Sequence, residues 1–489
     1  MIIKSFPLMI VLILFITAFI MPIVNKKNIV KGISLISMFI SLIFSIANLR
    51  GVLIGGKYCY SIGHFDAPFG IEFYIGNIES IMAVMFTFVA SMVIWYSIYS
   101  IDKDINENRI PLYYLLVNIL IGSLLGIVFT NDIFNAFVFI EIGTLASCGI
   151  VVIKDKKENI KATLKYLIMS CLGSGLVLMG IAFLYSMTGQ LNITYIHEVL
   201  INNYTNYPKA IVVTIGLFTI GLGVKSAMFP LHNWLPDAHS SAPTSSSALL
   251  SALVLKAFAI LLIKILYRGF GLEIIAGNMV LDILLILGIA GMVIGSVFAI
   301  FQRNIKRLVA YSTVAQMGYI FFGIGLGTEF GVTLAVFHMI GHAVTKSALF
   351  LCAGAIIEKT GHKEIDKLRG VGKEMPLTLG LFFIGSLSMI GIPVLPGFVS
   401  KWYLSLSSIR AGKPMLIIFI LISSLLNAVY YFPISINGFF GEENLKGKVY
   451  KSKRKPLKEL LPVMMLIIAM IGVGIASRNI IDIIKLGIG

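Results

Sequence analysis

Long apolar stretches follow one another along almost the whole chain, separated by short polar segments. Each stretch is close to the roughly 20 residues that an α-helix needs to cross a bilayer, and none alternates between apolar and polar residues as a membrane β-strand does. The pattern therefore predicts an all-α polytopic membrane protein. We expect fourteen spans, near residues 5–24, 29–49, 77–100, 110–130, 132–153, 165–187, 208–229, 247–267, 279–301, 308–327, 330–357, 376–409 (interrupted), 414–440 and 459–480.

The composition agrees with this class. Apolar residues make up 58% of the 489 residues and charged residues only 13%, with a mean hydropathy of +0.94. Soluble domains carry about 25% charged residues, so the composition excludes a soluble protein. No soluble domain and no low-complexity linker interrupts the predicted spans.

The net charge of +16 is divided unevenly between the two sides that fourteen spans would create. Of the 39 lysines and arginines, 25 fall in loops 25–31, 101–109, 154–165, 302–307, 358–375 and 441–458, while the opposite loops and both termini hold nine. Cytoplasmic loops of membrane proteins are rich in lysine and arginine. The distribution therefore predicts that both termini lie on the outer side of the membrane. The excess of basic residues is then explained by membrane topology and by contact with anionic lipid, and binding to nucleic acid is not needed to account for it.

Ionisable residues within the predicted spans are the first candidates for function. A lysine at the centre of a membrane helix costs roughly 2.5–3.5 kcal/mol on insertion scales, so such groups face water or a partner charge. The series comprises Glu141, Lys225, Lys256, His338, His342, Lys346 and Lys401. We interpret it as a proton relay, because a buried lysine beside a carboxylate can change its charge state.

The spacing of three residues supports the interpretation as a proton relay, whereas one further lysine is not included in the relay. His338, His342 and Lys346 are spaced four residues apart and therefore share one face of a helix. Lys264, by contrast, lies close to Arg268 near a predicted helix end, where its stem can extend to the membrane surface.

Prolines interrupt two of the spans beside two of the lysines. Pro230, Pro236 and Pro243 follow Lys225, and Pro393 and Pro396 precede Lys401. A helix can break at membrane depth only where protein or water satisfies the freed backbone groups. Broken helices that occur in pairs, one in each half of a chain, point to a transport site. We therefore predict two broken helices beside a buried hydrophilic path.

Further polar residues are candidates for the lining of this path, namely His232, Asp237, His239, Ser246, Tyr311 and Gln316. An alternative applies to every one of these groups. They can hold helices together through interhelical hydrogen bonds and take no part in transport. This purely structural alternative is weaker for the ionisable series as a whole than for any single lysine. The reason is that the series occurs in two similar settings, each with a lysine beside a span that prolines interrupt.

The chain lacks the motifs of common cofactor sites. Its four cysteines have no CxxC spacing, which argues against a zinc or iron–sulfur site. There is no P-loop and no GxGxxG motif that opens a βα unit, and Met339 stands where the HExxH motif of zinc proteases needs glutamate. We expect no cofactor, no metal and no redox or hydrolytic site in this chain, while its membership of an enzyme complex stays open.

Four segments resemble the antiporter-like membrane subunit family. They are KSAMFPLHNWLPDAHSSAPTSSSALLSALVLK (225–256), QRNIKRLVAYSTVAQMGYI (302–320), FHMIGHAVTKSALFLCAGAI (337–356) and GIPVLPGFVSKW (391–402). The family includes large membrane subunits of respiratory complex I, the A and D subunits of Mrp-type Na⁺/H⁺ antiporters, and matching subunits of membrane-bound hydrogenases. The segment DAPFGIEF (66–73) favours the D-type antiporter subunit and its hydrogenase counterpart.

The resemblance implies two inverted five-helix repeats, at 110–267 and 279–440. They would follow three N-terminal helices at 1–109 and precede a cytoplasmic basic loop and last helix at 441–489. Glu141 matches the family's helix-5 glutamate and Lys225 its helix-7 partner, while Lys256 matches the central lysine of helix 8. Phe258 departs from the small residues that are common there.

The second half carries the rest of the implied relay. His338, His342 and Lys346 match the relay of the family's helix 11, and Lys401 matches the terminal lysine of helix 12. Some complex I subunits have glutamate at that last position, so Lys401 favours the other branches of the family.

The leading hypothesis is a proton-translocating subunit of a multisubunit complex that exchanges Na⁺ for H⁺. Its rival is the same module as an ion-pumping subunit of a membrane-bound hydrogenase or a complex I-like NADH or ferredoxin oxidoreductase. A third hypothesis, from another class, is a membrane scaffold without an ion path. The resemblance implies partners that include another antiporter-like subunit, protons, Na⁺ and lipid, in the cytoplasmic membrane of a prokaryote.

Overall fold

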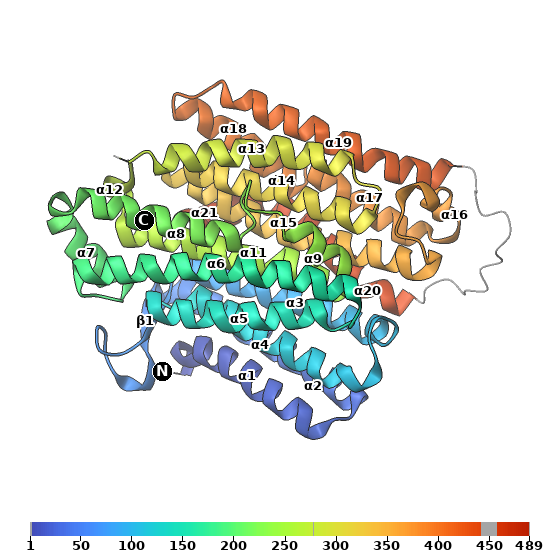
Figure 1. Ribbon diagram of the computed structural model, residues 1–489, viewed down its shortest axis with the longest axis horizontal. Coiled ribbons are helices and arrows are strands. Elements are labelled where there is room, and N and C mark those ends of the chain that lie inside the picture. The colour runs from blue at the N-terminus through green and yellow to red at the C-terminus, as the bar shows by residue number, and fades with distance from the viewer. Residues whose placement is uncertain (1, 277, 442–456, 489) are drawn as a thin grey trace.

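The computed structural model describes residues 2–276, 278–441 and 457–488. Its helices run side by side across the view of Figure 1, and the chain advances from α1 and α2 at the lower edge to α18 and α19 at the upper edge. The basic run predicted between Lys446 and Lys458 lies largely outside the described residues.

Thirteen helices in the described part of the chain are long and apolar enough to cross a membrane. The interrupted span predicted at 376–409 corresponds to two shorter helices, α17 (Pro376–Ile390) and α18 (Pro396–Arg410), separated by a break. The predicted all-α polytopic class is therefore confirmed. The thirteen are α1 (Phe6–Val24), α2 (Lys27–Gly55), α3 (Asn77–Asp104), α4 (Ile110–Phe129), α5 (Ile133–Val152), α6 (Lys157–Thr188), α8 (Pro208–Lys225), the continuous span Thr244–Phe270, α13 (Val280–Ile300), α14 (Ile305–Gly325), α15 (Glu329–Thr360), α19 (Leu416–Phe440) and α20 (Leu457–Ile475).

The span Thr244–Phe270 changes its winding along its length. It passes from α10 (Thr244–Leu249) through the π-helical turn η5 (Leu250–Val254) to α11 (Leu255–Ile263) and a second π-helical segment, η6 (Lys264–Phe270). Such π segments inside α-helices occur frequently at functional sites. Lys256 is the second residue after the first of them, so the irregular winding lies beside a residue of the ionisable series.

Short elements lie between the spans and at both termini of the described chain. β1 (Tyr58–Ser61) and β2 (Glu72–Ile75) form an antiparallel hairpin that the sequence analysis did not predict. There are also five short α-helices, namely α7 (Ile193–Asn203), α9 (Leu235–Ser241), α12 (Leu272–Ala276), α16 (Val371–Glu374) and α21 (Ser477–Lys485). Five 3₁₀ turns complete the described elements, namely η1 (Ile2–Ser5), η2 (Ile62–His64), η3 (Glu107–Arg109), η4 (Tyr204–Asn206) and η7 (Ile365–Leu368).

The five predicted basic loops that lie within the described residues, 25–31, 101–109, 154–165, 302–307 and 358–375, meet at one end of the helices, which we call the basic end. Ion pairs connect them there, including Lys154–Asp104 at 2.5 Å and Lys31–Asp102 at 2.6 Å. The segments η1, β1, α7 and α21 lie at the other end, on the left of Figure 1. An even number of crossings brings both ends of a chain to the same side, which agrees with fourteen spans.

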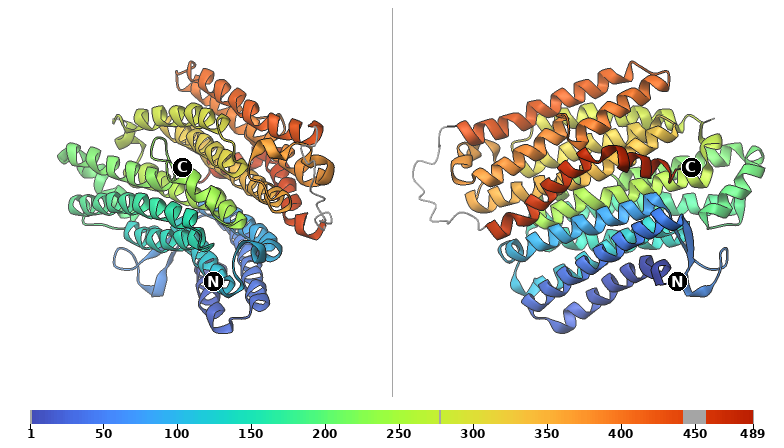
Figure 2. Two further views of the ribbon diagram at one scale, coloured as in Figure 1. Left: turned by 45° about the vertical axis from the view of Figure 1, so that its right-hand side comes forward. Right: turned by 180° about the vertical axis from the view of Figure 1, so that it is seen from behind.

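The middle of the chain forms the centre of the molecule. In the most apolar stretch of Thr244–Phe270, every residue is buried inside the protein. In the corresponding stretches of α14 and α15, 94% of the residues are buried. The last span, α20, returns across the back of the molecule in Figure 2 and packs on α3 and α15. The peripheral helices instead present large apolar side chains to the surroundings, for example Phe19 and Leu421, as lipid-facing helices do. Most of the ionisable series therefore lies on the best-enclosed helices.

Close packing of α13 against α14 depends on glycine. A Cβ atom added at Gly318 would lie 2.5 Å from the backbone nitrogen of Met292 and 2.7 Å from the carbonyl oxygen of Gly288. We expect Gly318→Ala to destabilise the protein by about 1–3 kcal/mol, because the two helices must separate to admit the methyl group. Thermal unfolding of the detergent-solubilised protein measures this effect. Gly175→Ala on α6, where nothing lies within 4 Å, is the matched control and should unfold as the unmodified protein does.

Candidate functional site

The first break in a span follows Lys225, the last residue of α8. The chain leaves helical geometry there, with Ala227 at a φ of 53°, and returns to it in α9. The indole nitrogen of Trp234 donates to the carbonyl of Val224 at 3.0 Å and so satisfies one of the freed backbone groups. Pro230 lies inside the break, Pro236 in the first turn of α9, and Pro243 between α9 and α10, as the predicted break requires.

Lys225 is buried at this break and pairs with Glu141 from the middle of α5. The distance between Lys225 Nζ and Glu141 Oε1 is 3.7 Å, and Nζ also donates to the hydroxyl of Thr144 at 2.9 Å. Ser174 on α6 donates to the same carboxylate oxygen. The predicted pair is therefore in place, but its members differ in environment. Only 1% of the Lys225 side chain is exposed, against 37% of Glu141.

Phe258 lies directly beside this lysine. Lys225 Nζ is 5.6 Å from the centre of the phenyl ring, a distance at which a cation and an aromatic face attract. Phe258 belongs to the same helix as Lys256, two residues further along. The aromatic residue that departs from the resemblance thus contacts the first lysine of the series.

Lys256 is fully enclosed and its ammonium group stays within its own helix. Nζ donates to the carbonyl of Ser251 at 2.5 Å. A helix that is wound with i→i+5 hydrogen bonds frees carbonyl groups from the regular ladder. The acceptor of this lysine, Ser251, thus belongs to the π-helical turn η5.

The predicted shared face on α15 is present and buried. The rings of His338 and His342 stack with centroids 6.0 Å apart, and Lys346 follows one turn later. Lys346 Nζ donates to the hydroxyls of Ser312 at 2.7 Å and Tyr431 at 3.2 Å, and to a backbone carbonyl of α14 at 3.0 Å. His342 lies within electrostatic range of both Lys256 and Lys346, so the charge of each group influences the others.

The second break places Lys401 at the end of a half-helix. α17 ends at Ile390, and Lys401 on α18 folds back to donate to the carbonyls of Met389 at 2.7 Å and Ile390 at 3.0 Å. Gly391, at a φ of 100°, lets the chain turn beside the lysine stem. Pro393 lies in the break, and Pro396 is the first residue of α18.

The two breaks share a physical feature. In each, a lysine ammonium lies at the C-terminal end of a half-helix, where the helix dipole favours positive charge. Unwound backbone at such a break is the usual place for ion sites in transporters. His338 connects the second break to the centre, because its Nδ1 is 2.8 Å from the hydroxyl oxygen of Ser400, the neighbour of Lys401.

Several buried polar atoms between these lysines have no protein partner among the described residues. They are both ring nitrogens of His342, Nε2 of His338 and both amide atoms of Gln316. Buried polar groups are normally hydrogen-bonded to protein or to internal water. His338 and His342 lie on the same face of α15 as Lys346, so the unpartnered ring nitrogens belong to the part of the series between Lys346 and Lys401.

The remaining predicted path residues fall into different settings. His232 is buried against Phe229 and near Tyr311, with ring centroids 5.3 and 6.1 Å away. Ser246 donates to the carbonyl of Ile150 at 3.1 Å and serves helix packing. Asp237 lies at the basic end, where it pairs with Lys165 at 2.8 Å and Arg307 at 2.7 Å. His239 is buried near three lysines, Lys256, Lys306 and Lys346.

The interpretation of Lys264 as a residue that extends to the membrane surface is wrong. Its side chain is buried, and Nζ donates to the carbonyls of Val128 at 2.9 Å and Thr130 at 2.5 Å. The end of α4 thus gives this lysine hydrogen-bond acceptors inside the protein. Nearby, Arg268 pairs with the fully buried Glu79 at 2.9 Å, an ion pair that the sequence analysis missed.

Lys306 was also missed, because it was assigned to a loop. It stands in the first turn of α14 and is buried. The only sign in the sequence is its position between a predicted loop and a predicted span. Among the described residues, no group of three or more histidine, cysteine or acidic side chains is placed to hold a metal ion.

The family model described as "NADH:quinone oxidoreductase/Mrp antiporter, TM" matches residues 130–427. This chain belongs to that family. The matched region contains every member of the ionisable series and both broken helices.

Relatives and solved structures within and around the family match almost the full chain. NADH-quinone oxidoreductase subunit N of Desulforudis audaxviator is 34% identical over 460 residues, which cover 90% of this chain and 88% of the relative. "Putative antiporter subunit mnhD2" of Staphylococcus aureus is 28% identical over 460 residues, with 94% and 90% covered. A chain of the membrane-bound sulfane sulfur reductase, an archaeal respiratory membrane complex, superposes with a TM-score of 0.90 at 27% identity, covering 98% of this chain and 96% of its own.

The Mrp complex from Dietzia sp. DQ12-45-1b shows the same fold. One of its chains superposes with a TM-score of 0.90 at 21% identity, covering 100% of this chain and 97% of its own. The antiporter-like fold therefore extends over the complete described chain, including the helices outside the family model's matched region.

Proposed function

We propose that this chain is the proton-translocating subunit of a multisubunit membrane complex. Protons pass along the buried series from Glu141 and Lys225 through Lys256 to the α15 cluster and on to Lys401. The observation that carries the proposal is the pair of lysines held at the ends of broken half-helices, joined through the enclosed centre by further ionisable groups. A purely structural set of interhelical contacts would not leave the buried imidazole nitrogens of His342 without a partner.

The partners of two of the lysines, Lys346 and Lys225, suit a change of charge. Lys346 is bonded to two hydroxyl groups and a carbonyl. Because a hydroxyl can both accept and donate a hydrogen bond, Ser312 and Tyr431 can satisfy an ammonium group and also a neutral amine. Lys225 has a choice between the Glu141 carboxylate and the Thr144 hydroxyl, so it can keep a partner when Glu141 gains a proton.

The exposure of Glu141 supports a neighbouring subunit at this face. A carboxylate in the middle of a membrane helix is costly to leave against lipid, and 37% of this side chain is exposed in the isolated chain. Coverage by another membrane subunit would remove that cost. We propose another antiporter-like subunit at α5 and α6, which would place a second relay beside the Glu141–Lys225 pair.

The topology follows from the charge distribution. We propose that the basic end faces the cytoplasm of a prokaryotic cell and that both termini lie on the outer side. Residues 110–267 and 279–440 would form two inverted repeats, each with one of the broken helices. The first 109 residues and the segment 441–489 would complete the subunit around them.

Two driving reactions are compatible with this module. Exchange of Na⁺ for H⁺ corresponds to the relative named as an antiporter subunit. Coupling to a redox reaction corresponds to subunit N of an NADH-quinone oxidoreductase and to the archaeal respiratory complex. In the second case the electrons would travel in other subunits. We keep cation–proton antiport as the first proposal and the redox-driven pump as the second.

The test uses the intact complex, purified through a tag on this chain and reconstituted into vesicles that contain a pH-sensitive dye. A pH change that follows a Na⁺ gradient supports antiport, whereas a pH change that needs an electron donor and acceptor supports the redox-driven pump. Identification of the co-purified subunits gives an independent answer. A complex that moves no protons under either condition contradicts the proposal and supports the scaffold hypothesis.

A further inference from the structure

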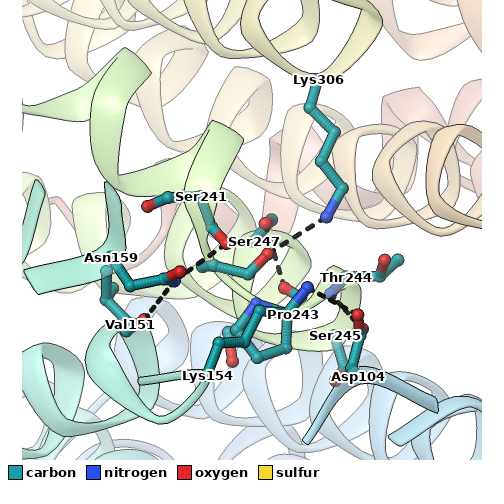
Figure 3. A network of polar contacts seen from close by, with 12 residues as sticks. Asp104, Val151, Lys154, Asn159, Ser241, Pro243, Thr244, Ser245, Ser247 and Lys306 are labelled. Atoms are coloured by element: carbon teal, nitrogen blue, oxygen red, sulfur yellow. Dashed lines mark hydrogen bonds and ion pairs between the residues drawn. The ribbon is translucent and has the colours of Figure 1, made fainter. Parts of the chain in front are cut away.

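A polar network at the basic end surrounds the turn that joins α9 to α10. In Figure 3, Lys306 reaches this turn from one side, and Asp104 and Lys154 reach it from the other. Lys306 Nζ donates to the carbonyl of Ala242 at 3.2 Å, and Asp104 Oδ2 accepts from the backbone nitrogen of Thr244 at 3.1 Å. The other oxygen of Asp104 pairs with Lys154 at 2.5 Å. One turn of chain is thus held by residues of α3 and α14, and Lys154, just after α5, holds Asp104 in turn.

Two cavities open at the same turn. One, of about 480 Å³, is lined by Asp104, Lys154, Lys306 and Thr244 among others. The other, of about 820 Å³, extends along Lys165, Asp237 and Arg307. Ser240, Ser241 and Lys363 line both cavities, so they are adjacent. Both are large enough for many water molecules, and most of the residues that line them are polar or charged.

Lys306 occupies a position where a permanent charge is poorly supported. It is 4% exposed and stands in the first turn of α14, where the helix dipole disfavours a cation. Lys154 and Lys363 add like charge nearby. In favour of the charge are the Ala242 carbonyl and the carboxylate of Asp104, which interacts with Lys306 electrostatically. The site therefore combines influences that favour the charge with influences that oppose it.

The inner side of this network leads to the buried lysines. His239 lies within electrostatic range of Lys306 and also of Lys256 and Lys346. Its carbonyl accepts from the hydroxyl of Ser247 at 2.7 Å, so it is fixed to the start of the helix that carries Lys256. Of the described residues, His239 therefore connects the network at the basic end with the centre of the molecule.

We infer that Lys306 is the entry residue of the relay, which takes a proton from the water-accessible cavity at the basic end and passes it inward towards His239. The inference rests on the proposed proton translocation and adds the side, the cavity and the first residue to it. Lys306 gains the proton as a neutral amine and becomes neutral again when the proton moves on, so no other reactant is needed. Asp104 and Lys154 set the charge around it and are positioning residues.

The test uses one variant, Lys306→Cys, in the reconstituted complex. A thiosulfonate that attaches an aminoethyl group restores an amine that can release a proton. A second reagent attaches a trimethylammonium ethyl group, which has almost the same size and a permanent charge. We expect the untreated variant to lose proton transport, the aminoethyl group to restore a large part of the rate, and the trimethylammonium group to restore none. Equal rescue by both reagents would overturn the entry role, because fixed charge would then be sufficient.

The same reagents report on the cavity without any need for transport. The charged trimethylammonium reagent should modify Lys306→Cys and Ser241→Cys from the cytoplasmic face of oriented vesicles and not from the outer face, as read by peptide mass spectrometry. The buried native Cys148 serves as the internal control and should remain unmodified. Thiols at both positions that react only from the outer face, or not at all, would overturn the inference.

A control and an independent outcome separate this inference from the proposed function. Lys367→Gln removes an exposed lysine at the same end of the molecule, outside both cavities, and should leave transport unchanged. An unmodified complex that moves no protons would overturn the proposed function and the entry role together. A complex that pumps normally while Lys306→Cys also pumps normally would overturn the entry role alone.

Discussion

Replacement of Lys401 by arginine should stop proton transport as completely as replacement by alanine. Arginine keeps the positive charge and much of the length, but its pKa above about 12 means that it does not release a proton in a protein. Lys401 is enclosed, and its ammonium group donates to Met389 and Ile390 at the end of α17. If this group must alternate between charged and neutral forms, a permanent cation will hold the half-helix in one state.

The measurement is the initial rate of pH change in vesicles with the two variants side by side. We expect both to fall to the rate of vesicles without the complex. Lys413→Arg, at an exposed lysine that pairs with Asp282 at 3.0 Å, is the matched control and should transport normally. Purification of the complex with all its subunits verifies assembly. An assembled Lys401→Arg complex with a normal rate would show that Lys401 supplies only fixed charge or packing.

The second large effect is expected at the Glu141–Lys225 pair. Glu141→Ala and Lys225→Ala should each abolish ion-coupled transport while the complex still assembles. Glu141→Ala should also reduce stability more, because it leaves a fully buried ammonium group with the Thr144 hydroxyl as its nearest partner. Breaking a buried ion pair costs about 3–5 kcal/mol, and the partial exposure of Glu141 lowers the expected cost to about 1–3 kcal/mol.

A double-mutant cycle with Glu141→Gln and Lys225→Met separates the charge pairing from packing. We expect the double variant to be more stable than the sum of the two single losses predicts, because it leaves no unpaired charge, and to remain inactive. Glu107→Ala, which removes an exposed partner of Lys27, should change neither transport nor stability measurably. Normal formation of a pH gradient by both single variants of the buried pair would remove it from the relay.

The architecture of the helices was readable from the sequence because its cause is local. A stretch of about 20 apolar residues satisfies its own backbone only as a helix in a bilayer, so each span was predictable from its own residues. The same holds for the common face of His338, His342 and Lys346, since a spacing of four residues places side chains together on any helix. The prolines likewise indicated both breaks, because proline removes a backbone donor wherever it occurs.

The sequence did not determine where the lysine side chains near helix ends would point. Hydropathy locates a helix end only to within a turn, and a long flexible lysine stem can reach either outward or inward. Lys264 turns inward because the carbonyls at the end of α4 lie beside it, and Lys401 turns back because Gly391 lets α17 end within its reach. Lys306 became a candidate only when the turn at Ala242 and the carboxylate of Asp104 were found around it. These partners come from distant parts of the chain, so the role of each lysine was decided by the tertiary structure.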